Sequence, residues 1–425
     1  MMCFALASVA AACHGVLDVQ SAGVITGNDV ATDTTLTRTF ANGIVNEFRG
    51  QYAWMAHAGA SASGEVEFSH AWGPWNEIGE RTITADSPVH VFFTYNYSAR
   101  ASGTGIQFVA ALRSALGDRA KRDSDFAKAL VYDGYSQLQI GLHYCEFPLG
   151  GGPPKPASEV LLAAIKLFEE AEYVATNANA TAYLTLSRVG LARAYLQLGN
   201  KAKVIEYAKQ VPATFSASVR YIDDNDMTIY NVYYRVVGLR TRGEFSLAYD
   251  ADVFKTMRDR RVPFESDSTQ LMFDTRATRR GFVPLQPRSF SGWAPGKAAA
   301  FTPDASIEFA SGLEATYMLA EAGGMSSADL RAFIDGRRAV GGQPAFGGTD
   351  AQLFDELLEQ RKWDFYLAGF RMGDLIRYKA LYGKDLWPKG RIGGFTSSFV
   401  KNYGSTECFP MSRTELNGNP NIPWP

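Results

Sequence analysis

The stretch LFDELLEQRKWDFYLAGFRMGDLIRYK, Leu353–Lys379, constrains how the rest of the chain can fold. Its first half repeats apolar residues at helical spacing, so one face of the predicted helix is apolar except for Arg361. Gly369 is expected to end this helix, because a residue without a Cβ atom can turn the chain there. A second, shorter helix is predicted to follow directly.

The second helix places Arg371, Asp374 and Arg377 three residues apart, so these side chains share one side of it. Arginine is rarely buried unless it is paired, and Asp374 is the nearest carboxylate that can accept a two-pronged hydrogen bond from Arg361. We interpret Arg361, Arg371, Asp374 and Arg377 as a structural clasp between two packed helices, in preference to a catalytic site.

This stretch also resembles a family signature. The C-terminal motif E-x-R-x-x-E-[LF]-x-x-E-G-x-R-x-x-D-L-x-R is typical of the SusD/RagB family of outer-membrane glycan-binding lipoproteins. The matching positions are Glu359, Arg361, Phe365, Gly369, Arg371, Asp374, Leu375 and Arg377. The sequence departs at Asp364 and Ala368, where the family usually has glutamate.

Other segments resemble motifs of the same family, in the same order along the chain. They are Leu17–Gln20, Tyr144–Leu149, Glu314–Ala322, Leu330–Gly341 and Pro410–Pro420. The arginine that the family carries before the third of these is replaced by Ser311, so that helix lacks one expected charge. The resemblance implies a mainly α fold, a scaffold of tetratricopeptide-like helical pairs with long irregular insertions and a few short strands.

The domain organisation follows from where helical periodicity holds and where it fails. We expect a signal peptide at 1–12 and a single domain at 13–425, with a helical scaffold at about 29–212 and 305–385. Ligand-facing insertions are expected at about 61–104 and 213–304, where glycine, proline and aromatic residues replace the helical pattern.

Within the scaffold, the first helix is predicted from Asp29 to Ala60, a second from near Gly105, and a third from Asp125 to about Phe147. One later segment has tetratricopeptide character, through Leu191, Ala192, Tyr195, Gly199 and Pro212.

Composition narrows the functions that the chain can have. The 425 residues are 46% hydrophobic and 20% charged, enough to bury a large core. A net charge of -2 gives no reason to expect a nucleic-acid partner. With 5 His and 4 Cys, and no metal-binding spacing, we expect no cofactor; a structural Ca²⁺ near Asp223, Asp224 and Asp226 stays open. Cys145 and Cys408 could form a disulfide, but the sequence does not show whether they meet.

The N-terminus resembles a lipoprotein leader. The apolar segment 1–12 ends in small residues before Cys13, forming the lipobox-like sequence A-A-A-C. No basic residue precedes it, so the leader is read as truncated. We expect Cys13 to be acylated and to anchor the protein in the outer membrane, facing the exterior. An ordinary signal peptide with an incidental cysteine is the alternative.

The candidate ligand-binding residues combine aromatic rings with polar neighbours inside the predicted insertions. Aromatic rings can lie against the C–H faces of sugars while amide and guanidinium groups bond to hydroxyls. The candidates are Trp72, Trp75, Asn76, Tyr95, Tyr97, Arg288 and Trp293. For any single member, packing in the core or at its rim is the alternative role.

Three functions from different classes compete. The resemblance implies a non-catalytic surface lipoprotein that captures an oligosaccharide, or a peptide, and delivers it to a SusC-like TonB-dependent transporter. A glycoside hydrolase would need two carboxylates across a cleft, and no spacing singles out such a pair. A tetratricopeptide scaffold that binds only proteins is the third, made less favourable by the leader and the aromatic insertions.

Overall fold

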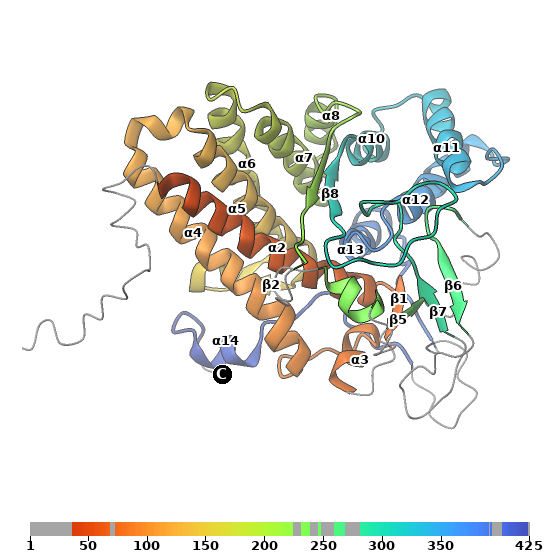
Figure 1. Ribbon diagram of the computed structural model, residues 1–425, viewed down its shortest axis with the longest axis horizontal. Coiled ribbons are helices and arrows are strands. Elements are labelled where there is room, and N and C mark those ends of the chain that lie inside the picture. Colours follow the sequence, from red (N-terminus) through yellow and green to blue (C-terminus); the bar gives the residue numbers. More distant parts are fainter. Residues whose placement is uncertain are drawn as a thin grey trace, which may run out of the picture.

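The computed structural model describes residues 36–68, 73–223, 231–238, 245–247, 259–267, 281–390, 392 and 402–423. The predicted leader, Cys13, Trp72, Asp224 and Asp226 lie outside these residues. Helices make up most of the described chain, which confirms the mainly α prediction (Figure 1).

The first helical group occupies the left and the upper middle of Figure 1. It contains α2 (Thr37–Ala62), α4 (Asn96–Leu116), α5 (Ser124–His143), α6 (Ala157–Asn177), α7 (Thr181–Gln197) and α8 (Lys201–Ala208). Helix α5 is the centre of this group, because it packs against α2, α4, α6 and α7 and is buried along almost its whole length.

The second helical group follows the irregular middle of the chain. It contains α10 (Gly312–Glu321), α11 (Ser327–Gly341), α12 (Leu353–Asp364) and α13 (Arg371–Tyr382). Helix α10 packs on α7 and α8, and α13 packs on α2 and α5, so the two groups share one core. Short helices complete the set: α3 (Gly73–Gly79), α14 (Arg413–Gly418), the 3₁₀ turns Gly117–Arg122, Leu149–Gly151 and Asp350–Gln352, and the π-helices η2 (His90–Tyr95) and η5 (Tyr234–Gly238).

The strands form antiparallel pairs only, among the residues that the structure describes. They are β1 (Val66–Phe68) with β5 (Phe245–Leu247), β2 (Glu146–Phe147) with β3 (Lys155–Pro156), β4 (Ser216–Val219) with β8 (Ile307–Ser311), and β6 (Phe264–Asp267) with β7 (Gly281–Pro284). The β4–β8 pair joins the end of the first helical group to the start of the second, because β4 follows α8 and β8 leads into α10.

The predicted insertion at 61–104 is helical over its last part, which corrects the sequence-based boundary. Helix α4 begins at Asn96 and η2 precedes it, whereas the sequence suggested a start near Gly105. The reason is close packing: a Cβ atom at Gly105 would lie 2.2 Å from the Asp133 carboxylate on α5. The small residues that looked like a loop allow two helices to approach each other.

The other predicted helices end within a few residues of their predicted ends. The first is described from Thr37 to Ala62, and its predicted start at Asp29 lies outside the described residues. The third ends at His143, after which the chain enters β2. In the tetratricopeptide-like pair, Tyr195 of α7 stacks on Tyr207 of α8 at 5.9 Å.

The stretch Leu353–Lys379 ends its first helix earlier than predicted. Helix α12 stops at Asp364, and the next residues form a turn in which Leu367 and Gly369 have positive φ. Glycine is required at position 369 because an added Cβ atom would lie 2.8 Å from Cα of Ala56 in α2. Gly369 therefore permits close contact between this turn and α2.

The clasp predicted between α12 and α13 is present. Nε of Arg361 donates to Oδ2 of Asp374 at 2.9 Å, and Nη2 of Arg377 donates to Oδ1 of the same carboxylate at 2.8 Å. All three side chains are buried. Arg371, by contrast, is half-buried and makes no ion pair within the described residues, so it is not part of the clasp.

The buried ion pairs continue from the clasp into α10 and α7. Arg377 also binds Glu321 of α10 through two hydrogen bonds of 2.7 and 3.0 Å. Arg193 of α7 binds Glu314 of α10 through two bonds of 2.6 Å. Ser311, where the family has arginine, instead caps α10, since its hydroxyl accepts a hydrogen bond from the backbone N–H of Glu314.

The two cysteines left open by the sequence form a disulfide. Cys145, just after α5, is joined to Cys408, 263 residues later in sequence. A backbone hydrogen bond from Cys145 to Phe409 and a buried Phe409 ring reinforce the same contact. The C-terminal segment is thus held against the end of α5.

Candidate functional site

The predicted ligand residues near the first insertion lie in the protein core. Trp75 is 8% exposed, Asn76 3% and Tyr95 4%. Trp75 stacks on Trp54 of α2, at 5.9 Å, and on Phe93 of η2, at 5.1 Å, and these two rings also contact each other. The Tyr95 ring instead contacts Tyr144 and Phe147, beyond the end of α5. The sequence suggested a ligand surface here, and the structure shows three buried side chains.

Tyr97 is the exception within this group, because its ring is half-buried at the edge of the same aromatic cluster. The guanidinium of Arg100 lies 5.6 Å from its ring centre, and that guanidinium is bonded to Glu47 at 2.7 Å. The backbone of Gly50 approaches the other side of the ring closely. Tyr97 therefore packs between α2 and α4, and little of its ring is available to a ligand.

The remaining predicted residues, Arg288 and Trp293, lie in a segment that pairs with a second stretch of the chain. The backbone N–H of Arg288 donates to the carbonyl of Arg261 at 3.0 Å, and Nε1 of Trp293 donates to the carbonyl of Arg260 at 3.2 Å. Leu285 bonds in the same way to Pro263. Chain 285–293 therefore runs alongside chain 260–263, just beyond the β6–β7 pair.

A pocket of about 380 Å³ opens beside this paired segment. The described residues that line it are Asp259, Arg260, Val262, Pro263, Phe264, Gly296, Lys297 and Ala298. Its volume falls within the range of small-ligand sites. Trp293 begins the tight turn that carries Lys297 to the pocket, since Ala294 and Lys297 form an antiparallel bridge. Trp293 is partly exposed and does not itself line the pocket, but its indole bonds to the backbone of Arg260, which does.

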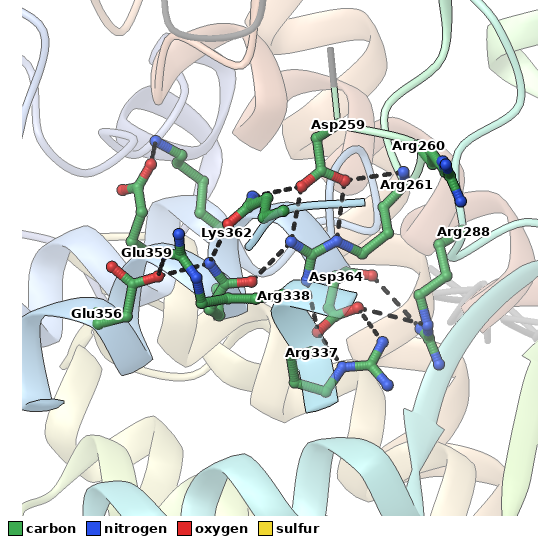
Figure 2. A network of polar contacts seen from close by, with 12 residues as sticks. Asp259, Arg260, Arg261, Arg288, Arg337, Arg338, Glu356, Glu359, Lys362 and Asp364 are labelled. Carbon is green, nitrogen blue, oxygen red and sulfur yellow. Dashed lines mark hydrogen bonds and ion pairs between the residues drawn. The ribbon is translucent and has the colours of Figure 1, made fainter. Parts of the chain in front are cut away.

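The wall behind the pocket is a buried network centred on Arg261 (Figure 2). Arg261 donates to both oxygens of Asp259, at 2.9 and 2.8 Å, and its Nη1 lies 3.2 Å from Oδ2 of Asp364. Gln343 donates to Asp259 at 2.6 Å, and Gln360 accepts from Arg261 at 2.7 Å. The side chain of Arg260 turns away from this network, which leaves it at the pocket.

Asp364 joins this wall to α11 and to β8. Nε of Arg337 donates to Oδ2 of Asp364 at 2.7 Å, and the hydroxyl of Tyr317 donates to the same oxygen. Nε of Arg288 lies 3.6 Å from Oδ1, and its Nη1 lies 3.2 Å from Glu308. Arg288 is therefore engaged with two carboxylates behind the pocket, although the sequence suggested a ligand contact.

The arginines around Asp364 determine its charge state. Burial alone would raise the pKa of this carboxyl, but the hydrogen bond from Arg337 and the positive charges of Arg261 and Arg337 hold it below its ordinary value. Asp364 is therefore ionised at neutral pH. Figure 2 shows the resulting alternation of carboxylates and guanidiniums, which fixes the backbone on one side of the pocket.

Sequence reasoning missed most of this wall. Asp259 and Arg261 lie in a segment without periodicity, and Asp364 looked like a surface residue of its helix. One signal was available: an aspartate two residues before an arginine can form a local bidentate pair, as Asp259 and Arg261 do. The pairing with Asp364 depends on the tertiary fold and has no local signature.

Comparison with known proteins identifies the fold. No family model matches the chain, and no curated protein does. Solved structures do match. A SusD-like carbohydrate binding protein from Bacteroides vulgatus is similar at 16% identity and a TM-score of 0.63, over 92% of this chain and 97% of that one.

Two further structures agree. A SusD homolog from Bacteroides thetaiotaomicron is similar at 12% identity and a TM-score of 0.67, over 92% of this chain and 97% of that one. A SusD superfamily protein from Parabacteroides distasonis is similar at 13% identity and a TM-score of 0.61, over 94% and 99%. The chain therefore has the SusD-like fold along nearly its whole length, as the sequence motifs predicted.

Proposed function

We propose that this protein is a non-catalytic saccharide-binding protein of nutrient uptake, and that its ligand occupies the pocket beside Trp293. The observation that carries the proposal is the likeness, over nearly the whole chain, to SusD-like structures, one of which is described as carbohydrate binding. The pocket adds local support, because it is the place where a predicted aromatic residue remains at the surface.

The chemistry of the pocket suits a sugar. Phe264 and Val262 supply an apolar wall, and the partly exposed indole of Trp293 offers a flat face to the C–H groups of a pyranose. Arg260 and Lys297 can donate hydrogen bonds to ring oxygens and hydroxyls. The wall behind Asp259 keeps this backbone rigid, which reduces the entropy cost of binding.

A binding role fits the pocket better than glycoside hydrolysis. A hydrolase needs one carboxyl group to act as acid and a second as base or nucleophile. Asp259 is the sole acid among the described residues that line the pocket, and its oxygens are occupied by Arg261 and Gln343. A carboxylate held in this way is a poor proton donor or nucleophile.

The proposal also includes delivery of the ligand to a transporter and anchoring of the protein in the membrane. The likeness to SusD-like proteins supports a SusC-like TonB-dependent transporter as the partner, and acylation of Cys13 would tether the protein to the outer membrane on its exterior side. None of the helices in the described ranges is long and apolar enough to cross a bilayer. Labelling with a radioactive fatty acid, compared with Cys13→Ser, tests the anchor, and co-purification of a β-barrel transporter tests the partner.

Trp293→Ala tests the ligand site. We expect the purified protein to bind members of a panel of neutral oligosaccharides, and the variant to bind them roughly tenfold more weakly, because an aromatic contact with the sugar is lost. Affinity is measured by isothermal titration calorimetry. Tyr173→Ala is the matched control, since Tyr173 is 57% exposed on α6, a different element.

Binding of peptides in place of saccharides would contradict the proposed ligand class. Equal losses in Trp293→Ala and Tyr173→Ala would contradict the proposed site. Release of reducing ends from any bound oligosaccharide would contradict the non-catalytic role.

A further inference from the structure

A second pocket, of about 410 Å³, lies where α2, α5 and β4 meet. Helix α2 contributes Val45, Phe48 and Arg49, helix α5 contributes Tyr132, and the chain 216–220 closes the other side. No described residue lines both this pocket and the one beside Trp293. The two pockets are therefore separate sites, and the role of the second is independent of the proposed function.

Two arginines line this second pocket, and neither forms an ion pair with a carboxylate of the described residues. Arg49 is half-buried, and the one side-chain contact it makes among described residues is a long hydrogen bond of 3.5 Å to Asn46. Arg220 is exposed and makes no ion pair within the described ranges. Arg188, which is half-buried like Arg49, is by comparison matched by Glu172 at 2.8 Å.

One acid is bonded to a residue of the pocket and is already occupied. Ser216, which lines the pocket, donates its hydroxyl to Oε2 of Glu308 at 2.9 Å. The other oxygen of Glu308 pairs with Arg288 at 3.2 Å. Glu308 therefore compensates Arg288, and within the described residues no carboxylate is paired with Arg49 or Arg220.

The two guanidiniums act on the same part of the pocket. Burial raises the pKa of Tyr132 to about 12, and the charges of Arg220 and Arg49 both oppose that rise, so each lies within electrostatic range of this phenol. The positive charges of both arginines therefore act at the side of the pocket that Tyr132 lines.

Strand β4 adds backbone groups to this arrangement. Consecutive residues 216–220 all line the pocket, although neighbouring side chains of a strand point to opposite faces. The edge of the strand must therefore border the pocket. Among the described strands β4 pairs with β8 alone, which leaves this edge unpaired and able to offer backbone N–H groups to an acceptor.

We propose that this pocket binds an oxyanion, a carboxylate or a sulfate, held between Arg49 and Arg220. The planar guanidinium fork matches both oxyanions and forms paired, charge-assisted hydrogen bonds with them. Tyr132 and Phe48 provide an aromatic surface for the carbon skeleton that carries the charge. The ligand class is therefore an acidic saccharide unit or another small organic anion of that size.

The experiment compares charged and neutral probes on the full chain. Sodium glucuronate, glucose and sodium sulfate are titrated at constant ionic strength, and binding is followed by calorimetry. We expect binding of glucuronate or sulfate and none of glucose at this site. The double variant Arg49→Gln/Arg220→Gln should bind the anion at least tenfold more weakly, whereas Arg49→Lys, which keeps the charge, should retain part of the affinity.

Arg260→Gln/Lys297→Gln is the matched control, because it also removes two positive charges, but from the other pocket. We expect it to leave anion binding unchanged. Anion binding lost in the control and kept in Arg49→Gln/Arg220→Gln would overturn the proposal, as would equal responses to glucuronate and glucose. Binding of sulfate without glucuronate would support it and identify sulfate as the group recognised.

The test of the anion pocket can be distinguished from the test of the saccharide site. Trp293→Ala should not change anion binding, and Arg49→Gln/Arg220→Gln should not change binding of neutral oligosaccharides. Circular dichroism of both double variants checks that each is folded. Loss of anion binding in a folded Arg49→Gln/Arg220→Gln, with neutral saccharide binding intact, is the expected result.

Discussion

Asp364 and Asp374 are both buried carboxylates held by arginines, at 0% and 3% exposure, yet they occupy different surroundings. Asp374 lies between α12 and α13 and contacts helical residues alone within the described chain. Asp364 is bonded to Arg261 and Arg337, and Arg261 in turn holds Asp259 at the wall of a pocket. Location relative to a pocket, and not residue type, therefore separates a structural network from one that supports a site.

Asp364→Ala should have the largest effect on stability. It would leave the buried charges of Arg261 and Arg337 without their shared counter-charge, so we expect the free energy of unfolding to fall by about 5 kcal/mol. We also expect saccharide affinity to fall, because Arg261 would no longer hold Asp259 in place. Urea unfolding and calorimetry at low temperature measure the two effects. Unchanged saccharide affinity in the folded variant would show that Asp364 does not support the ligand site.

Arg361→Ala or Asp374→Ala should be nearly as destabilising but should leave ligand preference unaltered. Each variant breaks a buried pair, which costs ~3–5 kcal/mol. The same urea unfolding measures the loss, and the oligosaccharide panel serves as the functional control. Normal thermal stability in both variants would show that the clasp does not stabilise the fold. Altered ligand preference would show that the clasp, like Asp364, affects the ligand site.

Arg288→Gln should have a smaller effect, because this side chain is 17% exposed and Asp364 keeps its other partners. We expect a loss of about 1–2 kcal/mol in the free energy of unfolding, between values for exposed and buried pairs. Saccharide affinity should stay within about twofold, since Arg288 faces carboxylates and not the pocket. A tenfold loss of affinity would instead restore the ligand contact suggested by the sequence.

Glu65→Gln should differ from these variants in sign, because it should be stabilising. Burial raises the pKa of Glu65 to about 8, opposed by the charge of Arg371 and by the backbone of Leu367, and both carboxyl oxygens are shielded from solvent. Unfolded glutamate ionises near pH 4, so this group contributes its full stability below about pH 4 and loses it as the pH rises towards 8. We expect the variant to be more stable at pH 7.5 by roughly 3–4 kcal/mol, because each unit of difference between the folded and unfolded pKa is worth about 1.4 kcal/mol.

The pH dependence of unfolding checks this assignment. The fall in stability between about pH 4 and pH 8 should be shallower in Glu65→Gln than in the natural protein. Identical slopes in the two proteins would show that Glu65 ionises in the folded state as freely as in the unfolded state. At low pH the two proteins should have the same stability.

Much of the fold could be predicted because helices show a periodic pattern of apolar residues in the sequence. The pair of Arg361 with Asp374 could be predicted from the spacing of charged residues in two adjacent helices. Gly105 misled the prediction, since glycine at a helix crossing and glycine in a loop look alike in one sequence. Trp75 and Trp293 illustrate the same limit for the site. Both occur in glycine-rich segments without a helical pattern, and only the tertiary fold buries one against α2 and leaves the other partly exposed beside a pocket.

The contact of α2 with the turn after α12 has a consequence for how the chain folds. The hydroxyl of Tyr52 donates to the carbonyl of Ala368, 316 residues away, and that of Tyr366 donates to the carbonyl of Glu65, 301 residues away. Contacts between residues so distant in sequence slow folding, because a long loop must close before they form. Helix α2 is made early in synthesis, so its buried face can be fully covered only after the last quarter of the chain has been made.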